Sequence, residues 1–376
     1  MKILMVCYKF PPQIDGIGDY TFHISQELIR SYSYEIKVFS QSSSTKNYEN
    51  LEVINLFNPV KPQSLLSLIK VVEEETPDCI IFHYNPFAYG YRFGINPFIP
   101  LMLNSLRLYF PKIKIVIIIH ESFIPIDSFK SFLLSHYLSC QLWLSCQNSD
   151  VLIPVIKPWL SKLKNWFPKK TICQIPVGSN IPYLIHDVHI AKKSMGINSD
   201  QCVLGFFGRV PRKMIEIEYI VKSVRLLQDK GFNPVLLYLG TDEKGAKLHF
   251  GEYQLITSSS TSPSEISQQL HAVDIFLVPT HEGLSTRKTS FMAGIQHGLS
   301  TVAILGESTD EILVSENRRS FILTESGNSN AFAQAVLELA ENPSLKQSIA
   351  EEAQNIYTKE FSWERITSQL VSLIDS

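Results

Sequence analysis

The sequence predicts two doubly wound α/β domains in tandem, and three observations lead to that prediction. Strand-like apolar runs recur along the chain with helix-like segments between them. These runs are continuous rather than alternating, which is typical of strands buried on both faces of a parallel sheet. The pattern then starts again after residue 200, and 376 residues suit two domains of about 150 residues each.

The first half of the chain alternates strands with helices. We expect strands at 2–8, 35–40, 79–84, 114–120, 150–155 and 171–178. We expect helices at 19–30, 64–75, 97–109 and 128–147. The apolar stretch 129–146 is interrupted by polar residues, so we interpret it as a buried helix and not as a membrane span. A polar stretch without a clear period follows, and it predicts a thin linker near 178–200.

The second half repeats the same alternation. We expect strands at 202–208, 234–240, 274–279 and 300–305, and helices at 215–229, 263–272, 284–297 and 329–341. The segment from Ser262 to Glu265 has the pattern of a capping box, with Pro263 at the first helical position. A last amphipathic helix is expected from about residue 362, with Trp363, Ile366, Leu370 and Leu373 on one face.

Composition excludes several classes of protein. Lys and Arg number 34 against 36 Asp and Glu, and this balance argues against nucleic-acid binding along one broad basic face. Apolar residues make up 45% of the chain, which excludes disorder as its main state. The six cysteines form no CxxC pair, so we expect reduced, buried thiols without zinc. The first residues lack a secretory apolar core, and the chain is therefore expected in the cytoplasm.

The first candidate motif is PPQIDGIGDY at 11–20, directly after the first strand. Gly16 and Gly18 allow close approach of a ligand, and a helix starting at Asp19 would point its N–H groups at an anion. A tight strand-to-helix turn explains the same residues equally well.

Two histidines end neighbouring strands of the first half. His83 and His120 each close an apolar run, so both reach the rim of the sheet, where binding side chains lie. Either histidine alone is better explained as a partly buried structural residue. Two at the same level favour a functional role, and no third residue has the spacing of a zinc site.

A cluster of cations follows the first strand of the second half. Arg209 comes directly after a strand and a glycine, with Arg212 and Lys213 close behind. Guanidinium and ammonium groups at a strand end suit a phosphate ligand. The alternative is a solvated loop, but Arg209 adjoins a buried run, where an unpaired charge is costly.

The segment 278–298 holds the fourth motif. A strand ends at Pro279, and a helix is expected from Leu284, with Arg287 and Lys288 one turn in. Glu282 precedes that helix and is positioned to accept hydrogen bonds from ligand hydroxyls. A helix-capping role for Glu282 is the alternative, although it leaves the two adjacent cations unexplained.

Together these segments resemble retaining glycosyltransferases of the GT-B fold, in glycosyltransferase family 4. The resemblance rests on PP…GIGDY, the HE strand end, IPVGSNI, GRVPRK, AVDIFLVPTHEG and FSWERI, in this order over nearly the whole chain. It implies two Rossmann-like domains facing each other across a cleft. Residues 1–180, with the returning helix 362–376, would form the acceptor side, and 200–361 would bind the nucleotide sugar.

The resemblance also implies roles for individual residues. The implied catalytic residues are His120 at the transferred sugar, Arg209 and Lys213 at the diphosphate, and Glu282 at the donor. The implied donor-binding residues are Gly16, Gly18, Arg212, Gly283, Leu284, Ser285, Arg287 and Ser290. The chain departs from the family pattern at three places: Asp15 replaces a glycine, the Arg209–Lys213 spacing is one residue short, and Ser290 replaces the second glutamate.

The activity implied is transfer of a hexose from a UDP- or GDP-linked donor to a glycan or lipid-linked hydroxyl, with retention and without metal or cofactor. Cell-surface polysaccharide or glycoconjugate synthesis is the expected setting. Ser290 also leaves open a catalytically impaired scaffold in a glycan-assembly complex, whereas an epimerase would need acid/base carboxylates in the first domain. Aromatics and lysines at 156–170 fit contact with the inner membrane face, or equally a solvated helix with buried aromatics.

Overall fold

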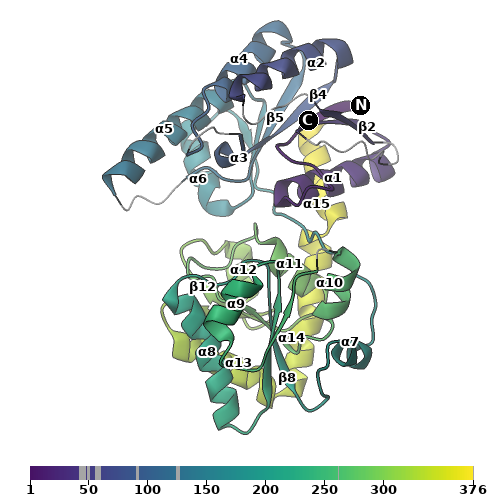
Figure 1. Cartoon of the computed structure of the whole chain (residues 1–376). Helices are drawn as coiled ribbons and strands as arrows, with labels where there is room; N and C mark the ends of the chain where they lie inside the picture. The colour runs from purple at the N-terminus through teal and green to yellow at the C-terminus, as the bar shows by residue number, and fades with distance from the viewer. Residues whose placement is uncertain are drawn as a thin grey trace. The chain divides into compact units, whose positions relative to one another are not determined.

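A computed structural model describes residues 1–41, 48, 51–55, 61–89, 93–123, 128–260 and 262–375. The chain forms two compact units, each with one parallel sheet between helices (Figure 1). Unit 1 contains Met1–Pro176 and Ile366–Ser376, and unit 2 contains Val177–Arg365. The predicted fold class, two Rossmann-like α/β domains, is confirmed.

Unit 1 has a seven-stranded parallel sheet in the order β3-β2-β1-β4-β5-β6-β7. Its strands are β1 (Lys2–Val6), β2 (Glu35–Ser40), β3 (Leu51–Asn55), β4 (Cys79–Tyr84), β5 (Lys114–Ile119), β6 (Val151–Pro154) and β7 (Thr171–Ile172). Its helices are α1 (Gly16–Tyr32), α2 (Ser67–Glu75), α3 (Pro86–Tyr89), α4 (Phe98–Tyr109), α5 (Phe129–Cys146) and α6 (Lys157–Trp166), with a 3₁₀ turn at Pro62–Leu66. The strand order reverses between β1 and β4, which places their carboxyl ends at a topological switch point.

Unit 2 has a six-stranded sheet in the order β10-β9-β8-β11-β12-β13. Its strands are β8 (Cys202–Phe207), β9 (Pro234–Leu239), β10 (Leu255–Ser258), β11 (Ile275–Val278), β12 (Thr301–Leu305) and β13 (Ile322–Glu325). Its helices are α7 (Val188–Ser194), α8 (Met214–Asp229), α9 (Glu243–Phe250), α10 (Pro263–Leu270), α11 (Thr289–Gln296), α12 (Glu311–Ser315), α13 (Ser329–Glu341) and α14 (Pro343–Ile356). A π-helical turn at Tyr357–Phe361 leads to α15 (Trp363–Ile374). Here the order reverses between β8 and β11.

The last helix, α15, returns the chain from unit 2 to unit 1. From Ile366 onward α15 belongs to unit 1, where Ile366, Leu370 and Ile374 are buried. Lys114 at the start of β5 donates to the Ile374 carbonyl at 2.6 Å. The apolar spacing expected in this helix therefore marks a packing face.

Several sequence expectations are wrong in detail. The strand expected at 171–178 is only Thr171–Ile172, and 177–200 belongs to unit 2, with α7, instead of forming a linker. The capping box does not form, because Glu265 accepts from Ser260 and not from the N-cap. The edge strands β3, β10 and β13 were not predicted.

Two predictions about burial also need correction. All six thiols are free, but Cys140 and Cys173 are exposed and not buried. The stretch 129–146 is a helix, α5, but one of its faces is exposed. Within 156–170, Trp159 and Phe167 are buried, which favours the solvated helix with buried aromatics. In the described part of the chain, no helix is both long enough and apolar enough to cross a bilayer.

Candidate active site

A pocket of about 240 Å³ opens in unit 2 at the switch point of the sheet. Its walls come from the loops that follow β8 and β11 and from the start of α11. The charged and hydroxyl-bearing side chains that line it are Arg209, Arg212, Lys213, Glu216, Thr280, Glu282, Lys288 and Ser290. Ligands of open α/β sheets bind at the carboxyl ends of the strands at this point, so the position itself indicates a binding site.

The backbone of the loop after β8 is held by contacts with the end of β9. Gly208 has a φ of +96°, a value that favours glycine, and the Tyr238 hydroxyl donates to the Gly208 carbonyl at 2.8 Å. A Cβ on Gly240 would lie 2.4 Å from the same carbonyl, so that position also requires glycine. Arg209 therefore starts from an anchored backbone.

Glu216 ties the two loops of the pocket together. From the first turn of α8, one carboxylate oxygen accepts from the backbone N–H groups of Arg212 at 3.3 Å and Lys213 at 3.4 Å. The other oxygen accepts from the N–H of His281 at 3.2 Å. The loop after β8 and the turn after β11 are thus held by one side chain, which the sequence analysis missed.

Lys213 and Glu282 face each other across the pocket. Lys213 Nζ lies 3.0 Å from Glu282 Oε1, and this hydrogen bond is the main reason that the pKa of Glu282 is below its ordinary value. The two side chains remain 51% and 55% exposed. An exposed ion pair contributes little to stability, so both groups can exchange partners with a ligand at small cost.

Lys288 contributes the fourth cation of the pocket. Burial lowers the pKa of Lys288, and the neighbouring charge of Arg287 acts in the same direction, whereas Glu282 and Glu216 oppose the shift. The family resemblance implies a donor-binding role for Arg287, but Lys288 lines the pocket and Arg287 does not.

The turn after Glu282 differs from the expected helix start. Gly283 has a φ of +100°, and a Cβ there would lie 2.6 Å from Thr309 Oγ1, so its glycine serves a packing contact. Leu284 is fully buried and its N–H donates to the Ile304 carbonyl at 2.8 Å, which occupies the group expected to bind phosphate. Ser285 is also buried and does not line the pocket.

The helix α11 therefore starts at Thr289, not at Leu284. Thr286 fixes the intervening turn, because Asp310 accepts from both its N–H at 2.7 Å and its hydroxyl at 2.8 Å. Ser290 consequently lies in the first helical turn, where a Cβ on Gly208 would be 3.8 Å from its own Cβ. It lines the pocket from the N-terminus of α11.

In unit 1 the two rim histidines contact each other. Nδ1 of His83 lies 2.9 Å from Nε2 of His120, and the Tyr20 ring packs edge-on against both imidazoles. Burial lowers the pKa of His120 to about 3 and that of His83 well below its ordinary value. Both rings are therefore neutral at physiological pH.

In the glycine loop of unit 1, which contains Gly16 and Gly18, two backbone N–H groups are bound by the carboxylate of Asp15. Asp15 is the N-cap of α1, and its carboxylate accepts from the N–H groups of Ile17 at 3.1 Å and Gly18 at 2.9 Å. A Cβ on Gly18 would meet the Lys9 carbonyl at 2.6 Å, whereas one on Gly16 would meet nothing. Gly18 is thus required for packing, and Asp15 uses the N–H groups expected to face a ligand.

Among the described residues, no three His, Cys, Asp or Glu side chains are grouped as a metal site would require. The pocket of unit 2 is instead lined by cations and two carboxylates.

A family model matches the unit that holds this pocket. Residues 201–342 match the family model described as glycosyl transferases group 1. The chain is 23% identical over 180 residues to the capsular polysaccharide biosynthesis glycosyltransferase CapM of Staphylococcus aureus. That match covers 45% of this chain and 46% of CapM, so it spans about half of either protein.

Solved structures share the fold over the full length. Sucrose-phosphate synthase from Thermosynechococcus elongatus superposes with a TM-score of 0.77 at 14% identity, covering 100% of this chain and 98% of that one. Anabaena Alr3699/HepE, solved with UDP and glucose, gives 0.72 at 14% identity, covering 100% and 99%. The chain therefore has the GT-B fold, and its second unit matches the group 1 glycosyl transferases.

Proposed function

We propose that the chain is a glycosyltransferase and that the pocket of unit 2 holds the diphosphate of a nucleotide-sugar donor. The observation that carries this proposal is the set of four cations, Arg209, Arg212, Lys213 and Lys288, in one pocket at the switch point. With Glu216 and Glu282, the charged lining groups sum to +2, which matches the two negative charges of a nucleotide-sugar diphosphate. The family match over 201–342 covers the same residues.

The proposed reaction breaks the bond between the anomeric carbon of the sugar and a diphosphate oxygen. The acceptor hydroxyl oxygen bonds to that carbon, and its proton passes to the leaving diphosphate. Negative charge grows on the leaving group, and Arg209 and Lys213 stabilise it from fixed positions. Attack on the face from which the diphosphate departs gives retention and requires no protein nucleophile.

In this proposal Glu282 and His120 form hydrogen bonds with the donor. Glu282 would exchange Lys213 for hydroxyl groups of the donor, and Lys213 would turn to the diphosphate. His120, neutral because of its burial, would donate a hydrogen bond to an oxygen of the transferred sugar. The cations perform the charge neutralisation that a divalent metal supplies in other transferases, so we propose catalysis without metal.

We propose UDP- or GDP-linked hexose as the donor and a glycan or lipid-linked hydroxyl as the acceptor. The complex of Alr3699/HepE with UDP and glucose supports a UDP-linked donor. The similarity to CapM supports a role in cell-surface polysaccharide or glycoconjugate synthesis.

One observation favours a second candidate, a scaffold protein without transferase activity. Ser290 lies in the pocket where the resembling family has a glutamate, and a hydroxyl holds ribose less tightly than a carboxylate does. A direct test incubates the protein with UDP- and GDP-sugars and follows release of nucleoside diphosphate by chromatography. Release supports the transferase. Absence of both release and calorimetric binding at millimolar nucleotide supports the scaffold, and a changed sugar configuration on intact donor would indicate an epimerase.

A further inference from the structure

Helix α5 of unit 1 presents an apolar face to solvent. Six large apolar or aromatic residues on it are substantially exposed: Phe129 (75%), Phe132 (42%), Leu133 (54%), Tyr137 (37%), Trp143 (41%) and Leu144 (38%). At 3.6 residues per turn all six fall within an arc of about 140°, so they share one side of the helix. A surface helix normally turns charged residues outward, and this one does the opposite.

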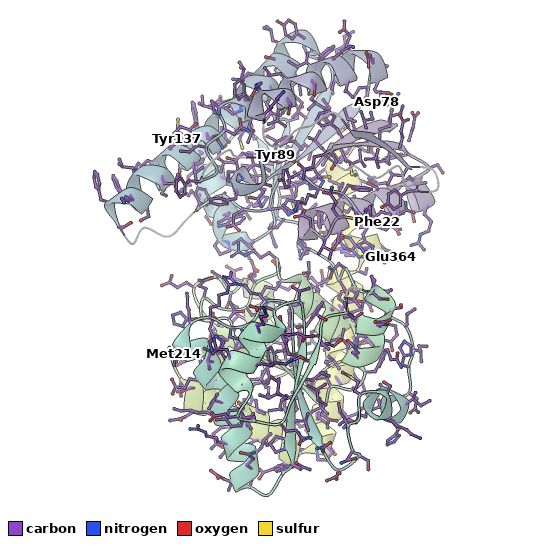
Figure 2. The ribbon with its side chains drawn as sticks, viewed as in Figure 1. Phe22, Asp78, Tyr89, Tyr137, Met214 and Glu364 are labelled. Atoms are coloured by element: carbon purple, nitrogen blue, oxygen red, sulfur yellow. The ribbon has the colours of Figure 1, made fainter. Side chains whose placement is uncertain are left out.

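This exposed face extends along the whole helix, which is 18 residues or about 27 Å long. Figure 1 shows the N-terminal half of α5 reaching beyond the sheet of unit 1, and Figure 2 marks Tyr137 on it. The opposite side of α5 is packed, with Leu138, Leu142 and Cys146 buried against unit 1. Its outward residues are therefore available to a partner without unfolding the helix.

Basic side chains border this apolar face. Trp143 stacks on Phe167, with ring centroids 6.4 Å apart, so the C-terminal half of α5 adjoins the segment after α6. Lys170 in that segment lies 5.8 Å from the centre of the Phe167 ring and donates to the Gln147 carbonyl at the end of α5. Lys164 and Lys169, close to Phe167 in the sequence, are exposed.

The sequence around α5 is strongly basic. Residues 79–176 contain ten Lys or Arg and three Asp or Glu, a formal charge of +7 in a chain whose total is −2. Of those three acids, Asp150 is paired with Arg107. From Ser128 to Ser149 the only charged residue is Lys130.

We propose that the outward face of α5 docks unit 1 on an anionic lipid bilayer. Phe132, Leu133 and Trp143 would enter the interfacial region, where aromatic rings are favoured, and the lysines would contact the anionic headgroups. A protein partner or a second copy of the chain would bury the same apolar groups, but neither explains the excess of positive charge. This surface differs from the one expected at 156–170, where Trp159 and Phe167 are buried.

Vesicle flotation tests this proposal. The wild-type protein is mixed with large vesicles of phosphatidylcholine alone or with about 30% phosphatidylglycerol, and the floated fraction is measured. We expect flotation with the anionic vesicles and a blue shift of tryptophan emission as Trp143 leaves water. The triple variant Phe132→Ser, Leu133→Ser, Trp143→Ser should lose at least tenfold in partition coefficient.

Matched variants separate the apolar and charged contributions. Leu248→Ser with Ile185→Ser removes two exposed apolar side chains of unit 2, at 80% and 87% exposure, and should float like the wild type. Lys164→Gln with Lys169→Gln should lower binding by about fivefold per lysine, since each is worth about 1 kcal/mol near an anionic surface. Donor hydrolysis by all these variants should match the wild type, which keeps this test separate from the proposed transferase activity.

Three results would overturn the proposal. The first is equal flotation of the protein with neutral and anionic vesicles, and the second is unchanged flotation of the triple variant. The third is a wild-type dimer, measured by light scattering, that becomes a monomer in the triple variant, together with no binding of the wild type to vesicles. The last result would assign the face to a second copy of the chain.

Discussion

Nδ1 of His83 and Nε2 of His120 lie 2.9 Å apart, so one proton is shared between two neutral rings. Nε2 of His83 is buried and has no partner among the described residues. A bare lone pair is tolerated there more easily than an orphaned N–H. Nδ1 of His83 is therefore protonated and donates a hydrogen bond to Nε2 of His120. Because Nε2 of His120 accepts this bond, the single ring proton of neutral His120 lies on its Nδ1.

This arrangement predicts the tautomer of His120 and its effect on turnover. In ¹⁵N-labelled protein, the nitrogen shifts of His120 should show protonated Nδ1, and neither ring should titrate between about pH 5 and 8. His83→Phe frees the ring and should lower kcat about fivefold, the worth of one neutral hydrogen bond. Nucleotide affinity should not change. The matched control is His189→Phe at an exposed histidine of unit 2, which should leave kcat unchanged. A protonated Nε2 on His120 would contradict the assignment.

Removal of the leaving-group cations should affect catalysis more than binding. Arg209→Ala and Lys213→Ala should each reduce kcat by about 10²-fold or more, because each removes a charge fixed for the transition state. The KM for the donor should change less. Steady-state kinetics with a UDP- or GDP-sugar provides the measurement, and Lys222→Ala on the exposed side of α8 is the control. Turnover of Arg209→Ala at the wild-type level would refute the phosphate assignment.

Glu216 should control both loops of the pocket at once. Glu216→Ala removes the acceptor of three backbone N–H groups, and we expect about tenfold weaker nucleotide binding in calorimetry. Glu216→Gln keeps one acceptor oxygen and should give an intermediate value. Glu218→Ala, two residues further along α8 where the carboxylate pairs with Lys222 and Ser329, should leave affinity unchanged. If Glu216→Ala binds nucleotide normally, the loops are held by other contacts.

Lys288 should make nucleotide binding sensitive to alkaline pH. Its pKa is below the ordinary lysine value, so it loses its charge at a lower pH than an exposed lysine does. A bound diphosphate favours the charged form, and affinity should therefore fall as the pH rises above neutrality toward that ordinary value. Lys288→Met should bind about tenfold more weakly and lose this part of the pH dependence. Calorimetry between pH 7 and about 9.5 compares the two proteins, and parallel curves would exclude Lys288 from the site.

Ser290→Glu should tighten nucleotide binding. The side chain starts in the first turn of α11, where a carboxylate is favoured by the helix dipole, and it faces the same pocket as Lys288. We expect about tenfold higher affinity if the new carboxylate reaches the ribose hydroxyls. Titration with UDP and GDP measures this, with Ser290→Gln as the uncharged control. If neither the wild type nor Ser290→Glu binds nucleotide at millimolar concentration, the pocket is not a donor site and the scaffold function is favoured.

The sheets could be predicted from sequence because their strands are continuous apolar runs, such as the wholly buried β4. The placement of His83 and His120 at the same rim of the sheet also followed, since parallel strands end at the same edge, but their direct contact was not predicted. The turn at 283–288 could not be predicted, because Thr286 is held by Asp310 and Leu284 by Ile304, both distant in sequence. That turn shifts the helix start and decides that Lys288, not Arg287, lines the pocket.

Two other features were hidden for different reasons. Glu216 has the pattern of an ordinary acidic residue in the first turn of a helix, and only the fold brings His281 to its second oxygen. The apolar residues of α5 predict a helix, but their number on both sides made burial the simpler interpretation. Only the three-dimensional packing separates its covered side from its exposed one.

The division of unit 1 into two stretches of sequence has a consequence for biosynthesis. Residues from Ile366 onward complete that unit, with Ile366, Leu370 and Ile374 buried and Lys114 bonded to the Ile374 carbonyl, but they follow all of unit 2 in the chain. On the ribosome, unit 2 can complete its core as one continuous segment, whereas unit 1 waits with an open apolar surface until α15 emerges. Unit 1 is therefore the part of the nascent chain most exposed to chaperones and proteases, although it is synthesised first.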